Sequence, residues 1–168
     1  MGHEEMDKMT SATATINILT AETLLSNWQG HRRVTRKTIE AFPEAKLFKF
    51  SIGGMRPFAE MVLEFIRMAV PIVDGVSTGK WAEYKGPVPT TKSELLQLWD
   101  EQTAELNAKF PNIPPHRFSE VDIAFWKWEG PGLGTIQYAI DNEIHHRGQG
   151  YVYLRALGIE PPPFWIRD

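Results

Sequence analysis

The segment EIHHRGQG, residues 143–150, places two of the chain's five histidines side by side on an otherwise apolar stretch. An imidazole can bind a metal ion or transfer a proton near neutral pH, so this segment is the first candidate for chemistry. Four polar or aromatic side chains in and beside this segment are separated by steps of three and four residues, namely Asn142, His146, Gln149 and Tyr153. Such positions share one face of a helix. A polar row on that face is costly in a dry core and therefore predicts a wet pocket, a metal site or a complete hydrogen-bond network.

The two histidines have different expected roles because a helix turns their side chains in different directions. His146 belongs to the polar row, whereas His145 points about a quarter-turn away and is expected to be structural or surface-facing. From residue types alone, His146 is either a hydrogen-bonded histidine or a metal ligand or base, and both interpretations stay open. Arg147 is expected to be a structural ion-pair partner.

Composition excludes several kinds of site. The chain has no cysteine, which rules out disulfides, thiolate metal sites and a cysteine nucleophile. The 18 basic and 21 acidic residues give a net charge of -3, so no general attraction to a nucleic-acid backbone is expected. The first residues are acidic and lack the basic region and long apolar run of an export signal, which leads us to expect a cytoplasmic protein. Residues 1–18 are expected to form an N-terminal extension that could be flexible.

Helical spacing of apolar residues and terminal signals predict four long helices. Thr91 to Glu94 form a capping box for one of them, and Gly158 with the proline run after it ends another. The predicted helices cover residues 20–42, 55–78 with a kink at Pro71, about 91–110, and 132–157. Residues 44–54 and 79–89 are expected to be loops, and 121–128 either a short strand or irregular. No apolar run is long enough to span a membrane. Together these features favour a single all-α domain over 1–168, a four-helix bundle.

Two segments carry a resemblance to a known family. The run NEIHHRGQ at 142–149, followed by YLRALGI at 153–159 and a proline cluster, resembles the C-terminal signature of the DinB/YfiT-like family. The run GMRPFAEM at 54–61 is similar to the start of that family's second helix. The resemblance implies an up-down-down-up bundle, often a homodimer, with a divalent zinc or nickel ion held by three histidines. It also implies a small-molecule ligand, since related members include thiol-dependent transferases and a thiol-dependent isomerase.

The family's metal ligands transfer only in part to this sequence. His146 matches the second ligand of the last helix, but Asn142 stands where the family has the first. The ligand of the second helix falls on Glu64, with Glu60 one turn earlier as the alternative. Since an amide oxygen is a weak, neutral ligand, the metal is expected to bind more weakly or to be lost. His31 on the first helix could supply a third ligand, or it could be a polar residue at the edge of a basic run.

Two functions follow from this partial match. In the first, the protein is a metal-dependent transferase or hydrolase in which Glu64 and His146 hold the ion and Gln149 or Tyr153 contacts the substrate. In the second, the bundle is a non-catalytic homodimer whose metal site has degenerated and which acts by binding a ligand or a protein. No glycine-rich phosphate loop and no membrane segment is present in the sequence.

Overall fold

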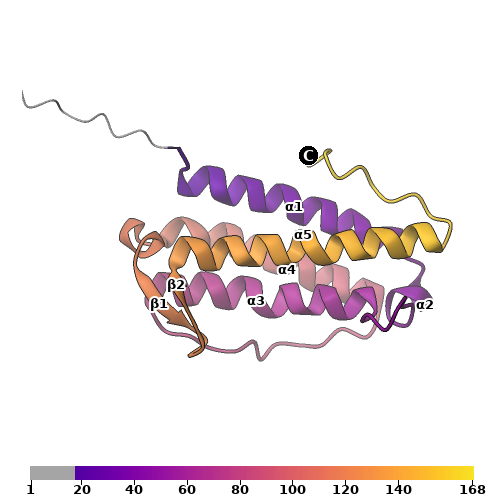
Figure 1. The fold of residues 1–168 in the computed structure, drawn as a ribbon, viewed down its shortest axis with the longest axis horizontal. Helices are drawn as coiled ribbons and strands as arrows, with labels where there is room; N and C mark the ends of the chain where they lie inside the picture. The colour runs from indigo at the N-terminus through magenta and orange to yellow at the C-terminus, as the bar shows by residue number, and fades with distance from the viewer. Residues whose placement is uncertain (1–17) are drawn as a thin grey trace, which may run out of the picture.

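The computed structural model describes residues 18–168, so residues 1–17 of the expected N-terminal extension lie outside the described residues. Four long helices lie side by side (Figure 1): α1 (Ala21–Ala41), α3 (Phe58–Thr78), α4 (Lys92–Lys109) and α5 (Gly132–Ala156). The shorter elements are α2 (Glu44–Leu47), the 3-10 turns η1 (Phe110–Asn112) and η2 (Pro115–Phe118), and strands β1 (Val121–Ala124) and β2 (Trp128–Pro131). The predicted helical class is confirmed, with one small sheet added.

The ends of the helices follow from local chemistry. Thr20 accepts a hydrogen bond from the backbone of Thr23 and so caps α1, while Thr91 and Glu94 form the predicted capping box of α4. Gly79 ends α3 in a left-handed conformation (φ 71°), which a residue without a Cβ adopts at little cost. Two boundaries differ from the prediction. Helix α3 begins after Pro57, not at Met55, and the expected loop 44–54 contains the one-turn helix α2.

Contacts between named residues fix the helix directions. Helices α1 and α5 run in the same direction, because Leu24 near the start of α1 shares an apolar cluster with Ile136 near the start of α5. Ile39 near the end of α1 shares the other cluster with Leu154 near the end of α5. Helix α3 runs opposite to α5, because Arg56 just before α3 contacts Tyr153 near the end of α5. Helix α4 runs opposite to α1, since Gln29 bonds to Asn107 whereas Arg36 bonds to Asp100 further back along α4.

A polar layer divides the buried core. One apolar cluster lies around Phe58, Phe65 and Trp99, and the other around Trp28 and Phe110. Between them along α1, α4 and α5 come buried polar side chains, namely Gln29, His31, Arg32, Thr35, Thr38, Gln102, Glu143 and Arg147. Each needs a partner inside the protein, because burying an unpaired polar group is costly.

Strands β1 and β2 pair in antiparallel fashion into a hairpin that precedes α5, with Ala124 opposite Trp128. Of the two predictions for residues 121–128, a short strand or irregular structure, the strand is confirmed at 121–124. At the tip, Phe125 and Trp126 have positive φ values of 50° and 60°. Bulky residues adopt this left-handed region at a cost of order 1–3 kcal/mol each. Across the described residues, no helix combines the length and apolar character that crossing a membrane would need.

Candidate functional site

The middle of α5 presents two polar faces to two different helices. Asn142 and His146, four residues apart, face α3, where both approach Glu64. Glu143 and Arg147, each one residue later, face α1. A step of one residue rotates a side chain by about 100° around a helix, so these alternating pairs separate onto different faces. The two faces form two clusters with different properties.

The first cluster surrounds the carboxylate of Glu64. Asn142 Nδ2 donates to Glu64 Oε1 at 3.0 Å, and Arg56 Nη1 lies 2.5 Å from Glu64 Oε2. His146 Nε2 lies 3.5 Å from Glu64 Oε1. The side chains of His146 and Glu64 are 15% and 29% exposed, so the cluster opens partly to solvent. Glu60, the alternative ligand on α3, is exposed and has no contact with this group.

The hydrogen bonds of His146 determine which ring nitrogen is free. His146 Nδ1 lies 2.7 Å from Gln149 Oε1, and because an amide oxygen only accepts, Nδ1 carries the proton. In the neutral ring, Nε2 then holds a lone pair that faces Glu64 Oε1, which is also an acceptor. Asn142 Oδ1 adds a third acceptor, since it is buried and has no hydrogen-bond partner. Because Nε2 and Glu64 Oε1 face one another, they require a proton on Nε2 or a cation between them.

Glu64 is ionised at neutral pH. Burial raises the pKa of this carboxyl, but hydrogen bonds from Asn142 and Arg56 and the charges of Arg56 and His146 outweigh it, so its pKa lies below the ordinary value. The carboxylate is therefore available as an anionic oxygen donor, with Arg56 as its present counter-ion.

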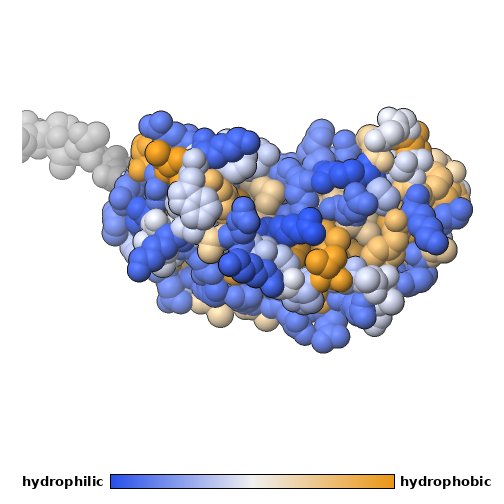
Figure 2. Space-filling view, turned by 90° about the horizontal axis from the view of Figure 1, so that it is seen from below, coloured by the Kyte–Doolittle hydropathy of each residue, from blue (hydrophilic) through white to orange (hydrophobic). Residues whose placement is uncertain are grey.

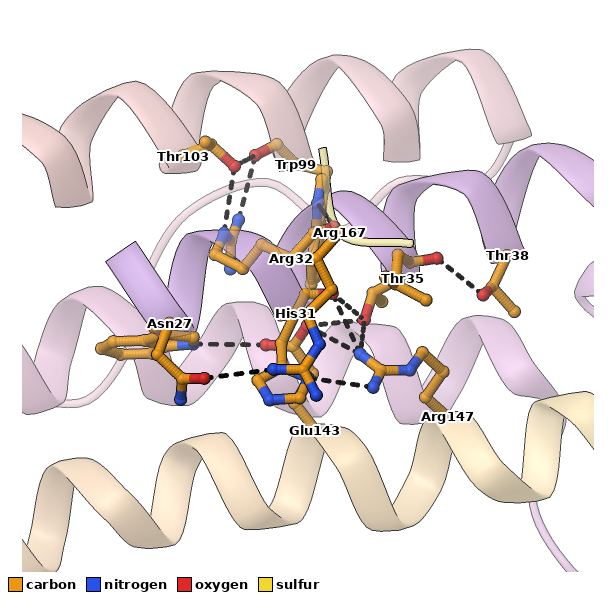
Figure 3. A network of polar contacts seen from close by, with 12 residues as sticks. Asn27, His31, Arg32, Thr35, Thr38, Trp99, Thr103, Glu143, Arg147 and Arg167 are labelled. Carbon is orange, nitrogen blue, oxygen red and sulfur yellow. Dashed lines mark hydrogen bonds and ion pairs between the residues drawn. The ribbon is translucent and has the colours of Figure 1, made fainter. Parts of the chain in front are cut away.

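The second cluster is buried between α1 and α5 (Figure 3). Glu143 accepts hydrogen bonds from Trp28 Nε1 at 3.3 Å and from Thr35 Oγ1 at 2.5 Å. Arg147 Nη1 donates to the backbone oxygen of His31 at 2.9 Å and to Thr35 Oγ1 at 3.0 Å. Its other terminal nitrogen lies 3.1 Å from His31 Nδ1, and its guanidinium is 3.9 Å from Glu143. Glu143 and Arg147 are 1% and 4% exposed. This cluster is closed and internally paired.

His31 belongs to this second cluster and not to the first. Its Nδ1 accepts from Arg147, which makes it a neutral structural acceptor. Burial, followed by the positive charges of Arg147 and Arg167, lowers the pKa of His31 from 6.5 to about 4. Within residues 18–168, no three His, Asp or Glu side chains gather closely enough to hold a metal ion. The predicted set of His31, Glu64 and His146 is therefore not assembled, because α1 turns His31 toward Arg147.

A groove of about 1080 Å³ adjoins the first cluster. Its lining comes from α3, the segment 79–91, the hairpin and α5, and includes Glu64, Arg67, Met68, Ile72, Tyr84, Phe125, Lys127, Trp128 and Tyr138. Figure 2 looks onto the side of the molecule where α3 and residues 79–91 lie in Figure 1, and shows hydrophobic side chains set among hydrophilic ones. A concave, largely apolar surface with a few polar groups at one end is typical of a small-molecule site.

The family assignment follows from a comparison with protein-family models. The DinB family model matches residues 78–168, which is more than half of the chain. The chain belongs to the DinB family. This assignment confirms the resemblance inferred from the residues at 142–159.

Known DinB-like proteins share the fold at low sequence identity. The uncharacterised protein YjoA of Bacillus subtilis (strain 168) is 23% identical over 146 residues, covering 84% of this chain and 94% of YjoA. The crystal structure of YjoA matches with a TM-score of 0.69 at 18% identity, over 86% of this chain and 99% of that one. A DinB-like protein from Bacillus cereus ATCC 10987 matches with a TM-score of 0.62 at 19% identity, over 84% and 95% of the two chains.

A mycothiol-dependent maleylpyruvate isomerase also has this fold. Its structure matches with a TM-score of 0.61 at 13% identity, over 77% of this chain and 60% of the isomerase. At this identity the likeness establishes a common fold and nothing about the reaction of the present DinB-family chain.

The two predicted substrate-contacting residues of this DinB-family chain differ in position. Gln149 is half-buried and holds His146 through its side-chain oxygen. Tyr153 is fully buried and does not line the groove; its ring packs edge-on against Phe50 and its hydroxyl donates to the backbone oxygen of Arg56 at 2.9 Å. Tyr153 is a core residue because α5 turns its side chain into the space between helices.

Sequence reasoning missed Arg56 and most of the buried network. Arg56 lies in the quoted GMRPFAEM segment, but nothing in its spacing shows that it meets a carboxylate two turns into α3. Thr35 and Glu143 could have been found, because a threonine and a glutamate at apolar positions of two amphipathic helices indicate buried polar pairing. The expected structural role of Arg147 agrees with its contacts.

Proposed function

We propose that this DinB-family protein binds a divalent metal ion through Glu64 and His146, with Asn142 as a weaker neutral ligand. The observation that carries the proposal is the set of three acceptors described above. In the neutral form of His146, Nε2 faces the acceptor Glu64 Oε1 at 3.5 Å, and Asn142 Oδ1 is buried without a partner. A cation between Nε2 and Oε1 would satisfy both, and Asn142 Oδ1 is a further acceptor on the same face of α5.

The residues fit a metal site of moderate affinity. A carboxylate and an imidazole suit Zn²⁺ or Ni²⁺, and a ligating histidine commonly donates its other N–H to a neighbouring acceptor, as His146 does to Gln149. Two features weaken the fit. The amide of Asn142 replaces an imidazole of the family pattern, and Arg56 already neutralises Glu64. We therefore expect weaker binding than at a site with three histidines.

The same site supports a metal-dependent transferase or hydrolase reaction on a small molecule in the groove. A bound Zn²⁺ or Ni²⁺ would lower the pKa of a coordinated water or thiol and polarise the substrate. Gln149 keeps the ring of His146 in one orientation and tautomer, and Asn142 Nδ2 holds the carboxylate of Glu64 in place. The thiol-dependent isomerase with the same fold supports a thiol-containing substrate or cofactor. The helix directions described above support the up-down-down-up order implied by the family resemblance.

A second candidate function is supported by the ion pair between Arg56 and Glu64. If Arg56 replaces the metal as the counter-ion, the protein is a non-catalytic bundle with a degenerate site, and it acts as a ligand-binding or interaction protein. A homodimer would suit this alternative, because the family resemblance implies one.

Metal analysis of tag-free protein separates the two functions. We expect stoichiometric metal after incubation with Zn²⁺ or Ni²⁺, together with a higher Tm, because a ligand that binds only the folded state stabilises it. His146→Ala should abolish both effects. The matched control is His145→Ala, which removes the neighbouring, exposed imidazole and should retain both. No bound metal and no thermal shift in the unsubstituted protein would support the non-catalytic alternative.

A further inference from the structure

We infer that the groove binds a small molecule with a planar apolar body and an anionic head group, the head lying at the Glu64 end. The inference deepens the proposed function, on which the placement of the head rests, by naming the class of ligand. It is carried by the shape of the groove, by an aromatic wall that the fold holds in place, and by the distribution of charge along the groove.

The groove follows the two helices that carry the first cluster. On α3, the lining residues Glu64, Met68 and Ile72 recur at steps of four and so form one row. On α5, Tyr138 stands four residues before Asn142 and continues the row of the cluster. Eight helical residues span about 12 Å, so the groove has a polar end at Glu64 and an apolar end about 12 Å away. This length suits a small amphipathic molecule.

The apolar end has a wall of aromatic rings from the hairpin. Trp128 meets Phe125 edge-on at a centroid distance of 6.3 Å, and Trp81 packs against Phe125 at 5.1 Å. Trp81 in turn rests on α3 at Gly75, where a Cβ would lie 2.3 Å from its ring. Glycine at this position lets the tryptophan approach the helix backbone. Trp128 is 58% exposed, which leaves its ring available to stack on a ligand.

The hairpin tip keeps Phe125 in the groove despite an unfavourable backbone. Phe125 and Trp126 occupy the two left-handed positions of a turn closed by hydrogen bonds from Trp126 N to Ile123 O and from Lys127 N to Ala124 O. Glycine and asparagine are the residues usually found at such positions. Strained residues of this kind cluster at ligand-binding sites, where the side chain serves the site. Phe125, which lines the groove, fits that pattern.

Charge along the groove distinguishes its two ends. At the polar end, Glu64 is paired with Arg56, and Arg67 lines the groove about one turn further along α3. In the part of the chain that the structure describes, Arg67 makes no ion pair and no side-chain hydrogen bond. Arg67 lies near Tyr84, as do Glu101 and Glu105 of α4, but neither carboxylate pairs with it. Its guanidinium can therefore bind a ligand, and a guanidinium binds carboxylate and similar anions strongly.

The hairpin end differs in its charges. Lys127 Nζ, in the hairpin turn, lies 4.9 Å from the ring centroid of Trp128, and Glu129 of β2 also lines the groove. The positive charge of Lys127 is therefore offset by a carboxylate. An anionic head group is therefore expected beside Arg67 and the planar body beside Trp128 and Tyr138.

Two fluorescent probes with nearly the same body test this inference. 8-Anilinonaphthalene-1-sulfonate has a planar naphthalene ring and an anionic sulfonate, whereas N-phenyl-1-naphthylamine lacks the sulfonate. Titrations in the presence of EDTA keep the result independent of the metal proposal. We expect one binding site per chain and tighter binding of the anionic probe. Equal affinity for the two probes would overturn the assignment of an anionic head.

Four variants locate the site. Trp128→Ala should weaken both probes by about tenfold, the scale of one lost aromatic contact. Tyr138→Ala, on a different element and 60% exposed, should weaken both in the same way and provides a second test should the hairpin change. Arg67→Gln should weaken only the anionic probe. The matched control is Trp165→Ala, which removes a tryptophan of similar exposure outside the groove and should change neither affinity.

Two results would contradict the proposed ligand site. Unchanged binding in Trp128→Ala and Tyr138→Ala, with Tm values that show both variants to be folded, would overturn the inference. So would an equal loss in Trp165→Ala, which would indicate general association with exposed aromatic surface. If the probes behave as expected while His146→Ala leaves metal content unchanged, the ligand class stands and the metal proposal fails.

Discussion

Two faces of the same two turns of α5 have opposite properties. Toward α1, Glu143 and Arg147 are almost fully buried, and each has several partners in the closed network of Figure 3. Toward α3, Asn142 and His146 are partly exposed, and Asn142 retains a buried acceptor without a partner. Complete pairing fixes the position of a helix, whereas incomplete pairing beside a groove leaves atoms available to a ligand. The role of a histidine or a carboxylate in this bundle therefore depends on the partners it meets and not on its residue type.

The largest change in stability is expected when the closed face of α5, the side that turns Glu143 and Arg147 toward α1, is broken. The open face is the side that turns Asn142 and His146 toward α3. Glu143→Ala removes the acceptor of Trp28 and Thr35 and the carboxylate that faces the buried guanidinium groups of Arg32 and Arg147. We expect a loss of about 3–5 kcal/mol in the free energy of unfolding, the scale measured for breaking a buried ion pair. Urea unfolding monitored by circular dichroism measures it. Glu64→Ala on the open face is the comparison and should cost less than about 1 kcal/mol. Similar losses in the two variants would contradict the distinction between the faces.

The next largest effect concerns His31, which should make the free energy of unfolding depend on pH. Its folded pKa of about 4 lies below the unfolded value of 6.5, so between these values the unfolded chain binds the proton and the folded protein does not. Stability contributed by the neutral ring is therefore complete above pH 6.5 and is lost as pH falls toward 4, by roughly 3 kcal/mol at most. His31→Gln should flatten the stability profile in this window. A profile that is the same in the variant would show that His31 is not held neutral.

The open face should become a better metal site when an imidazole is restored. Asn142→His places a histidine four residues before His146, at the position where the family pattern has a ligand. We expect Zn²⁺ affinity to rise by about tenfold or more, equivalent to ~1.4 kcal/mol, because imidazole is a stronger ligand than an amide oxygen. Isothermal titration calorimetry measures the gain. Asn142→Gln is the control, since it keeps an amide and should show no increase.

The smallest expected effect concerns Gln149. Gln149→Leu removes the acceptor that fixes the His146 tautomer but leaves every metal donor in place. Loss of such a supporting hydrogen bond commonly lowers metal affinity by about 10-fold to 100-fold at tight sites, and we expect the lower end here because His146 is partly exposed. Folding stability should change by less than about 0.5 kcal/mol. A metal affinity equal to that of the unsubstituted protein would show that Nδ1 needs no partner.

Much of the fold could be predicted because its signals are local. The capping box at Thr91, the terminator at Gly158 and helical spacing located the long helices to within a few residues. Helical direction also separated His146 from His145 and paired it with Asn142. These inferences need only the geometry of one helix.

The site contacts could not be predicted, because they depend on how the helices are rotated relative to one another. The sequence places His31 on an inward-facing part of α1 but does not say whether it meets Glu64 or Arg147, because both lie on neighbouring helices. For the same reason Tyr153 was expected in a pocket and lies in the core. The aromatic turn at Phe125 and Trp126 carries no glycine or asparagine to indicate it, and it is stabilised by contacts with Trp81 that are distant in sequence.

The proposal that Glu64 and His146 hold a metal ion is tested most directly by a Zn²⁺ titration followed by NMR of the histidine ring nitrogens in ¹⁵N-labelled protein. We predict that the Nε2 signal of His146 shifts with saturation at one ion per chain, while the signals of His31 and His145 stay in place. The shift should disappear in Glu64→Ala, which removes the second donor and leaves the ring. A titration in which His146 does not respond, or in which His31 responds equally, would contradict the assignment of the open face as the metal site.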